Sequence, residues 1–156
     1  MIPKTIHYIW FGHNEFSDLI KDCIESWKKV MPDYEFVLWN EDNYDINKTL
    51  FTKQAYEAKK YAFVSDYARI DILNKYGGIY FDTDVKVLKR FDKFLVLKGF
   101  MGFESAKGGV NPGIVIGCEK GCPILGEILQ EYDKPFIKKN GEYDYTTIVQ
   151  RTFVVL

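Results

Sequence analysis

The sequence predicts an α/β fold with three layers, α/β/α, in which helices cover both faces of a central sheet. Apolar segments of strand length alternate with segments of helical periodicity, as they do in such folds. The 156 residues, of which 47% are hydrophobic, suffice for one core. Acidic residues follow directly on an apolar strand, and open α/β sheets bind ligands beyond the carboxyl ends of their strands. We therefore expect one Rossmann-like domain over residues 1–156, with its site at that edge.

The first part of the chain predicts a strand, a helix and a second strand. Residues 5–11 are rich in β-branched and aromatic side chains, which favours a strand. In residues 15–31 the apolar side chains recur at steps of three and four, which is typical of an amphipathic helix, and Pro32 ends it. Residues 34–39, of sequence YEFVLW, predict the second strand.

The rest of the chain continues the alternation. The expected elements are helices at 48–60 and 61–76, strands at 79–81, 99–103 and 114–116, and a helix at 123–132. Gly77 suits the left-handed residue that ends a helix. The strand 79–81 leads directly into Asp82 and Asp84. Residues 143–150 show no pattern that predicts a helix or a strand.

Composition and charge restrict the classes of function. Lys and Arg number 21 against 22 Asp and Glu, a formal net charge of −1, so a nucleic-acid partner is disfavoured. No apolar run approaches the roughly 20 residues of a membrane-spanning helix, and the N-terminus does not have the layout of a signal peptide. We expect a cytoplasmic protein, peripheral at most to the inner membrane face. The three cysteines are expected to be buried apolar residues rather than a disulfide framework.

Asp82 and Asp84 are the first candidate site. In an extended segment the side chains at i and i+2 project to the same side, so the two carboxylates are expected to face one point. A hard divalent cation relieves their repulsion, and Mg²⁺ or Mn²⁺ commonly sits between one or two carboxylates and the phosphate oxygens of a substrate. The alternative is a pair of solvated carboxylates on a turn.

Asp66 and Arg69 are the second candidate pair. They lie three residues apart on one helix, and hence on one face, with apolar neighbours on both sides. The alternative is an intrahelical ion pair on the surface, which contributes a few tenths of a kcal/mol. A buried helix would instead require partners for both charges. We expect Asp66 to accept hydrogen bonds from sugar hydroxyls and Arg69 to bind anionic oxygens.

Three stretches carry a resemblance to a known family. They are residues 2–12 (IPKTIHYIWFG), residues 62–70 (AFVSDYARI) and residues 76–85 (YGGIYFDTDV). In this order they resemble glycosyltransferase family 32, which carries the DXD sugar-binding motif and includes capsular polysaccharide transferases, and they are similar to the glucosylating domain of large clostridial toxins. The resemblance implies a GT-A-like fold and a metal-dependent enzyme. Its reaction would move a sugar from a UDP- or GDP-sugar to a glycan or other hydroxyl acceptor, with retention of configuration, in polysaccharide biosynthesis.

The resemblance also implies roles for individual residues. Asp84 would bind Mn²⁺ or Mg²⁺ directly, while Asp82 would bind the ribose or donor sugar and reach the metal. Asp66 and Arg69 would hold the donor sugar and the diphosphate. The residues expected to line the nucleotide pocket are Ser65, Tyr80 and Trp10, of which Trp10 would stack on the base, worth roughly 1–3 kcal/mol.

Weaker candidates have equally good structural explanations. His7 lies among apolar neighbours and is expected to be a hydrogen-bonded core residue. His13 is expected on a surface loop. Asn111 could face the sugar, but a plain turn explains it as well. Asn40 could touch the base.

Two other functions remain open from the residues. A haloacid-dehalogenase-like phosphatase would use Asp82 as its nucleophile, although that class needs its motif after the first strand. The second alternative is a noncatalytic module that binds a nucleotide sugar. Family members generally continue past the point where this chain ends at Leu156, so we expect a donor-binding portion truncated at its C-terminus.

Overall fold

The computed structural model describes residues 1–103 and 109–156. Its five-stranded sheet has the order β2-β1-β3-β5-β4. The strands are β1 (Thr5–Ile9), β2 (Glu35–Trp39), β3 (Gly78–Tyr80), β4 (Gly99–Met101) and β5 (Ile116–Cys118). β1 is parallel to β2 and β3, whereas β5 is antiparallel to both β3 and β4. The α/β prediction is therefore confirmed, with a mixed rather than a purely parallel sheet.

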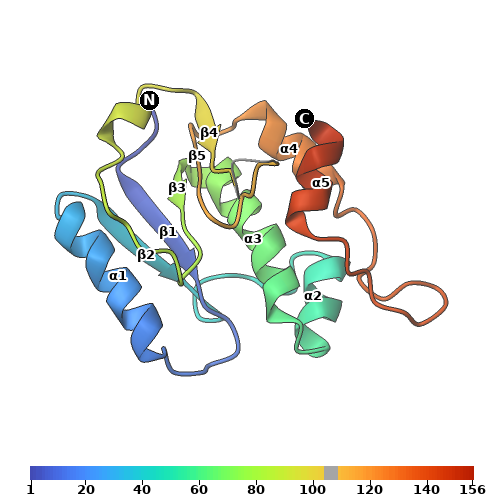
Figure 1. Ribbon diagram of the computed structural model, residues 1–156. Helices are drawn as coiled ribbons and strands as arrows, with labels where there is room; N and C mark the ends of the chain where they lie inside the picture. Colours follow the sequence, from blue (N-terminus) through green and yellow to red (C-terminus); the bar gives the residue numbers. More distant parts are fainter. Residues whose placement is uncertain (104–108) are drawn as a thin grey trace.

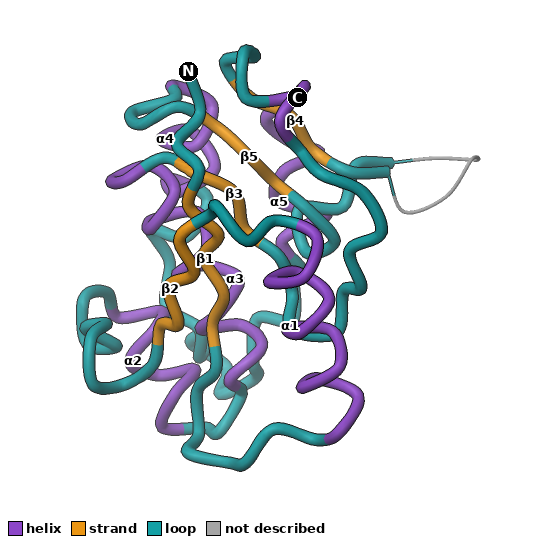
Figure 2. Tube along the Cα trace, turned by 90° about the vertical axis from the view of Figure 1, so that its left-hand side faces the viewer, coloured by secondary structure: helices purple, strands orange, loops and turns teal. Residues whose placement is uncertain are grey.

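Helices cover both faces of the sheet, which gives the predicted three layers (Figures 1 and 2). The helices are α1 (Asp18–Val30), α2 (Leu50–Glu57), α3 (Tyr61–Tyr76), α4 (Pro123–Gln130) and α5 (Ile148–Val155), with a 3₁₀ turn η1 (Asp92–Phe94). Figure 2 shows α1 on one side of the strands and α2 and α4 on the other. Within residues 1–103 and 109–156, no helix combines the length and the hydropathy that crossing a bilayer requires.

The two faces of β1 supply two separate cores. Ile6 and Tyr8 point to one face, where they join the buried Trp27 of α1. Ile9 points to the other face and joins the buried core of α2, α3 and α4. This alternation is the two-residue period of a strand. Apolar burial on both faces fixes the strand register, because a slip by one residue would turn every side chain to the wrong side.

The reversal between α3 and β3 brings the end of β3 close to the start of α3. Gly77 ends α3 with φ +67°, and its amide donates to the carbonyl of Leu73. A Cβ on Gly77 would lie 2.7 Å from the backbone nitrogen of Lys120, so glycine is required by space as well as by conformation. Because β3 then runs back along α3, Asp82 lies near the N-terminal half of that helix.

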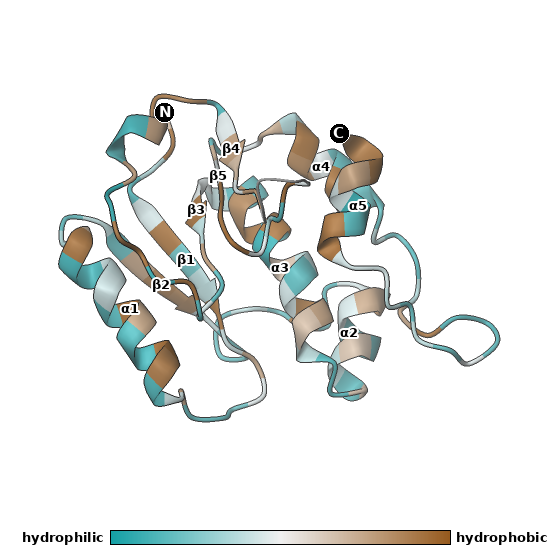
Figure 3. Cartoon of the chain, in the orientation of Figure 1, coloured by the Kyte–Doolittle hydropathy of each residue, from teal (hydrophilic) through white to brown (hydrophobic). Residues whose placement is uncertain are grey.

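The C-terminal part of the chain differs most from the prediction. β5 begins two residues later than expected, at Ile116. The segment 143–150 contains the start of α5, whose N-cap Thr147 forms a capping box with Gln150. The last turn of α5 is coloured as apolar in Figure 3, yet Phe153, Val154 and Leu156 are each more than half exposed. The last turn of α5 therefore carries apolar side chains that the rest of the described chain leaves uncovered.

Candidate donor site at the end of β3

A pocket of about 460 Å³ lies at the carboxyl ends of β1 and β3 and beside the N-terminal half of α3. We call it the donor pocket, after the role expected from the sequence. Six of the seven residues proposed from sequence line it: Trp10, Ser65, Arg69, Tyr80, Asp82 and Asp84. The seventh, Asp66, lies behind Arg69 and is not part of the lining. Residues far apart in the sequence thus meet at the edge where open α/β sheets bind ligands.

The segment that carries Asp82 and Asp84 is a turn and not an extended strand. β3 ends at Tyr80, and the amide of Val85 donates to the carbonyl of Asp82 at 3.1 Å. The expectation that both carboxylates project from an extended segment was therefore wrong, because the i to i+3 hydrogen bond closes a turn. Both side chains still line the pocket, and Asp84 is exposed there.

Arg69 is the centre of the site. Its Nη2 lies 2.9 Å from Oδ1 of Asp66, and its Nη1 lies 3.1 Å from Oδ1 of Asp82. The guanidinium also lies over the ring of Tyr80, 4.7 Å from the centroid, and its Nε donates to the carbonyl of Ser65 at 3.3 Å. One buried cation thus holds two carboxylates from two different elements, as a guanidinium fork can.

Two members of the cluster, Asp66 and Arg69, are desolvated, which raises the energy of their charges, whereas the side chain of Asp82 is 37% exposed. Arg69 is 6% exposed and Asp66 is 14% exposed, so the surface ion pair considered from sequence is not what forms. Burial raises the pKa of Asp66 and of Asp82, while the charge of Arg69 opposes both shifts. The Tyr80 hydroxyl donates to Oδ1 of Asp82 at 2.8 Å, and burial raises the pKa of that hydroxyl. Such a cluster is maintained at a cost in stability.

Asp66 connects the site to the C-terminal helix. Its Oδ2 accepts a hydrogen bond of 3.2 Å from the amide of Ile148, the first residue of α5. A carboxylate at a helix N-terminus satisfies a free amide and complements the helix dipole. The contact joins residues 82 positions apart, and no local sequence signal could have predicted it.

The turn before β5 closes the site from the other side. Oδ1 of Asn111 accepts from the amide of Gly113, and the carbonyl of Gly113 accepts from the amide of Asp82 at 3.1 Å. A Cβ on Gly113 would lie 2.6 Å from Oδ2 of Asp82 and 3.0 Å from Nη1 of Arg69. Asn111 therefore shapes a turn that packs onto the cluster, and glycine is required at 113 by the close approach.

Trp10 separates the donor pocket from a second hollow of about 510 Å³. Its indole Nε1 donates to the carbonyl of Asn14 at 2.6 Å, which fixes the loop after β1. Asn40 and Glu41 line the second hollow and not the donor pocket. Oε1 of Glu41 accepts from the amide of Gly12 and from the hydroxyl of Tyr56, at 2.6 Å and 2.8 Å. Glu41 thus ties the loop after β2 to the loop that carries Trp10.

The histidines have the structural roles expected of them. Trp39 Nε1 donates to Nδ1 of the buried His7 at 3.1 Å, so Nε2 carries the proton and donates to the carbonyl of Gly77 at 2.9 Å. Burial lowers the pKa of His7, which keeps the ring neutral. His13 is exposed on a loop with φ +58°. Cys23 and Cys118 are buried and free, and Cys122 is half-buried.

The residues present fit a divalent cation that is shared with a substrate. Among the described residues, no group of three or more His, Cys, Asp and Glu side chains could hold a metal by itself. Mg²⁺ and Mn²⁺ do not need such a group, because they bind through one or two carboxylates plus waters and phosphates. Arg69 pairs with Asp66 and Asp82, and Asp84 lies beside them, so these four side chains carry an excess of two negative charges when all are ionised.

Sequence reasoning missed several lining residues. Asn14, Tyr61, Ala62 and Thr83 also line the donor pocket. Tyr61 and Ala62 lie one turn of α3 before Ser65, so helical spacing from the candidate pair would have found them. Asn14 comes from an irregular loop, where periodicity gives no signal.

Comparison with known proteins identifies the family of this chain. The profile of the family described as "Glycosyltransferase sugar-binding region containing DXD motif" matches residues 17–100, more than half of the 156 residues. Those residues include Asp66, Arg69, Asp82 and Asp84. The chain therefore belongs to this DXD glycosyltransferase family.

Individual relatives are considerably longer than this chain. Inositol phosphoceramide mannosyltransferase 3 of Schizosaccharomyces pombe is 30% identical over 97% of this chain and 42% of its own length. Subversion of eukaryotic traffic protein A of Legionella pneumophila is 25% identical over 93% of this chain and 27% of its own length. The chain thus spans less than half of these relatives.

A solved structure confirms the fold. The glycosyltransferase PaToxG superposes with a TM-score of 0.66 at 24% identity, covering 83% of this chain and 59% of that one. The fold is therefore GT-A-like, as the resemblance implied. The family match also removes the phosphatase alternative, since Asp82 follows the third strand of this sheet and not the first.

Proposed function

We propose that this chain binds a UDP- or GDP-sugar together with Mn²⁺ or Mg²⁺ and transfers the sugar, with retention of configuration, to a hydroxyl acceptor. Residues 1–156 would form one catalytic, donor-binding domain. The observation that carries the proposal is the cluster at a strand end in which the buried pair of Asp66 and Arg69 contacts the partly exposed Asp82, with exposed Asp84 beside it. Its excess negative charge is complemented by a divalent cation, and a cation in turn attracts a diphosphate.

The pocket offers a binding group for each part of a nucleotide sugar. The rings of Trp10 and Phe16 pack edge to face, with their centroids 5.2 Å apart. Trp10 would supply a stacking platform for the base. Ser65 and Tyr80 also line the pocket and would contact the nucleotide. Asp84 and Asp82 would hold the cation. Arg69 would bind diphosphate oxygens, and we propose that Asp66 positions Arg69 from behind.

The chemistry requires stabilisation of the leaving diphosphate. In glycosyl transfer the bond from the anomeric carbon to the diphosphate oxygen breaks through an oxocarbenium-like state, and a bond to the acceptor oxygen forms. A bound divalent cation supplies Lewis-acid stabilisation of the developing phosphate charge. Arg69 adds a fixed positive charge that needs no reorganisation, because Asp66 and Tyr80 already hold it in place.

The name of one relative suggests which donor sugar and which class of acceptor to test first. The relative in Schizosaccharomyces pombe bears the name of a mannosyltransferase acting on inositol phosphoceramide. This favours a hexosyl donor, with mannose as the first to test, and an acceptor that carries a sugar or polyol. Polysaccharide biosynthesis, including that of capsular polysaccharide, and a cytoplasmic location remain part of the proposal.

A thermal-shift screen tests donor binding directly. The chain is heated with each of a panel of UDP- and GDP-sugars, with and without MnCl₂. A ligand at a hundredfold excess over its Kd stabilises by about 2.7 kcal/mol. We expect one nucleotide class to raise the melting temperature only when Mn²⁺ is present. A panel without any metal-dependent shift would contradict the proposal.

A turnover assay separates an enzyme from a noncatalytic binding module. Release of nucleoside diphosphate is followed with and without methyl α-D-mannopyranoside as acceptor, and NMR gives the anomeric configuration of the product. An enzyme of this kind shows acceptor-dependent release with retention. Tight donor binding without any release would identify the binding module.

A further inference from the structure

Glu41 is a buried carboxylate beside the donor pocket that does not line it. It lies in the loop after β2 and lines the second hollow, which shares Trp10 and Asn14 with the donor pocket. Its side chain is 12% exposed. Burial would raise the pKa of Glu41, but hydrogen bonds from the Gly12 amide and the Tyr56 hydroxyl lower it, so the side chain is ionised at neutral pH. Burying such a charge is costly unless its surroundings compensate it.

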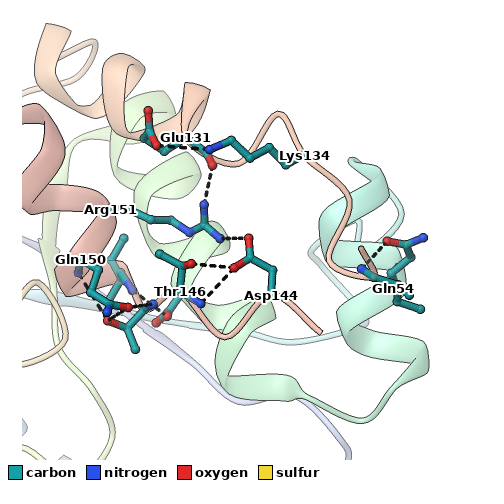
Figure 4. Close-up of polar contacts among 11 residues, drawn as sticks. Gln54, Glu131, Lys134, Asp144, Thr146, Gln150 and Arg151 are labelled. Atoms are coloured by element: carbon teal, nitrogen blue, oxygen red, sulfur yellow. Dashed lines mark hydrogen bonds and ion pairs between the residues drawn. The ribbon is translucent and has the colours of Figure 1, made fainter. Parts of the chain in front are cut away.

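A second buried carboxylate, Asp144, has the compensation that Glu41 lacks. Oδ2 of Asp144 lies 2.8 Å from Nη2 of Arg151, and its Oδ1 accepts from the amide and the hydroxyl of Thr146 (Figure 4). Asp144 is 11% exposed, almost the same as Glu41. Within the described residues, however, Oε2 of Glu41 is buried without a hydrogen-bond donor, and the basic side chain within 4 Å of Oε1 is the exposed His13. Glu41 is therefore buried at a cost in stability that its own contacts do not fully offset.

The loop that Glu41 holds has a strained backbone. Gly12 and His13 have φ of +96° and +58°, and a histidine in this left-handed region is kept there only by contacts around it. Oε1 of Glu41 supplies such a contact, because it accepts from the Gly12 amide at 2.6 Å. The same oxygen accepts from the hydroxyl of Tyr56, in α2, at 2.8 Å. The carboxylate therefore joins the strained loop to a helix.

The conformation of this loop determines where the indole of Trp10 lies. Nε1 of Trp10 donates to the carbonyl of Asn14 at 2.6 Å, and Asn14 follows Gly12 by two residues. A Cβ on Gly12 would lie 2.5 Å from Cε2 of Tyr61, so the loop backbone packs directly on a ring that lines the donor pocket. The orientation of the Trp10 ring thus depends on residues 12–14, whose backbone is anchored at the Gly12 amide.

We propose that Glu41 is a positioning residue for the nucleotide: with Tyr56, it holds the loop in the conformation in which Trp10 is ready to stack on the base. This inference rests on the proposed function and deepens it, since it names what keeps the base platform in place before the nucleotide binds. A loop that is already ordered loses less entropy on binding. Without the carboxylate, binding would have to order the loop, and affinity would fall.

Calorimetric titration of UDP and GDP into the full chain, each with MnCl₂, tests this role through a double-mutant cycle. Glu41→Ala should weaken binding of the preferred nucleotide about tenfold, and Trp10→Ala at least as much, because stacking on the base is lost. The double variant should bind like Trp10→Ala alone, since Glu41 acts through Trp10. Glu41→Gln keeps an acceptor oxygen for the Gly12 amide and should bind within about twofold of wild type.

Asp42→Ala is the matched control, because Asp42 is the next residue of the same loop, is also acidic and is exposed. It should bind as wild type does. Melting temperatures of all variants show which of them are folded. Tyr56→Phe removes one of the two donors to Glu41 and keeps the ring, so it replaces Glu41→Ala in the cycle if that variant does not fold. It should bind about threefold more weakly than wild type.

Two results would overturn the positioning role of Glu41 while leaving the donor site in place. The first is binding as tight as wild type by Glu41→Ala, or by Tyr56→Phe where it takes its place. The second is an equal loss in the wild-type and Trp10→Ala backgrounds, because Glu41 would then not act through Trp10. Failure of the wild-type chain to bind either nucleotide would instead contradict the proposed function, and the positioning role with it.

Discussion

Arg69 and Arg90 each hold two aspartates, but they do so in opposite surroundings. The partners are Asp66 and Asp82 for Arg69, at 2.9 Å and 3.1 Å, and Asp33 and Asp92 for Arg90, at 2.7 Å and 2.6 Å. Arg69 is 6% exposed and lies near the carboxyl end of β3, whereas Arg90 is 41% exposed. The Arg90 group lies near the amino ends of β1 and β2, because it also includes Lys4.

The difference between the two clusters is in solvation and charge balance. Lys4 and Arg90 balance Asp33 and Asp92, and water reaches all four side chains. Arg69 faces a desolvated carboxylate at Asp66 and a partly exposed one at Asp82, with a third, exposed carboxylate at Asp84. An exposed, balanced cluster contributes little and needs no ligand. A buried cluster with unbalanced charge lowers the stability of the protein unless a bound cation balances that charge. The Arg69 cluster therefore indicates a binding site, whereas the Arg90 cluster, built from the same residue types, does not.

Replacing the two arginines should give the largest contrast. Arg69→Met leaves Asp66 and Asp82 without their shared partner, and the free energy of unfolding should fall by about 3–5 kcal/mol. Arg90→Met should be hard to distinguish from wild type, since its aspartates remain in water. Urea denaturation at neutral pH measures both. Equal losses would show that the two clusters do not differ as described.

Asp84→Asn should remove ligand binding without affecting the fold. The melting temperature of the ligand-free variant should match wild type, because Asp84 is exposed. The added stability from Mn²⁺ and nucleotide sugar, about 2.7 kcal/mol at a hundredfold excess over Kd, should disappear. Differential scanning fluorimetry with and without Mn²⁺ gives both values. Asp92→Asn is the matched control and should keep the ligand response.

Asp82→Asn should not lower the free energy of unfolding at neutral pH, because the charge of Asp82 destabilises the folded protein there. Burial raises the folded-state pKa of Asp82 above the value of 3.8, so the folded protein binds this proton more tightly than the unfolded chain does. Stability from Asp82 is therefore lost as pH rises through the folded-state pKa. At neutral pH the variant should be at least as stable as wild type, and this advantage should vanish below pH 3.8. A variant less stable than wild type at neutral pH would contradict the argument.

The exposed cluster should show the opposite sign and the smallest effect. Hydrogen bonds from Lys4 and Arg90 lower the pKa of Asp33 to about 2. Its contribution is therefore present above pH 3.8 and lost as the pH falls toward 2. Asp33→Asn should weaken that acid dependence slightly and leave nucleotide-sugar binding unchanged. Urea midpoints measured across the acidic range, together with a binding assay, check both statements.

The sequence was sufficient for the parts of the fold that rest on local patterns. The bounds of α3 were predicted to the residue, because its apolar spacing is followed by Gly77 and Gly78. Asp82 and Asp84 were found because acidic residues directly after an apolar strand are conspicuous. In each case the signal lies within a few neighbouring residues.

What the sequence did not predict depends on contacts between distant segments. The amide of Ile148 on Asp66 and the close approach of Gly113 to Asp82 join parts of the chain far apart. The start of α5 was missed because Asp144, Thr146 and Thr147 have turn-forming side chains, which here serve an Asp144–Arg151 pair and a capping box. Local propensity cannot distinguish a loop from a capped helix start that tertiary contacts stabilise.

Calorimetric titration of UDP-glucose and GDP-mannose into the chain, with and without MnCl₂, tests the central claim most directly. The wild-type chain and Arg90→Met should bind one of the two donors in the presence of Mn²⁺, and Asp84→Asn should not. Binding of the same strength without metal, unchanged binding by Asp84→Asn, or no binding of either donor to the wild-type chain would contradict a metal-dependent donor site at Asp82 and Asp84.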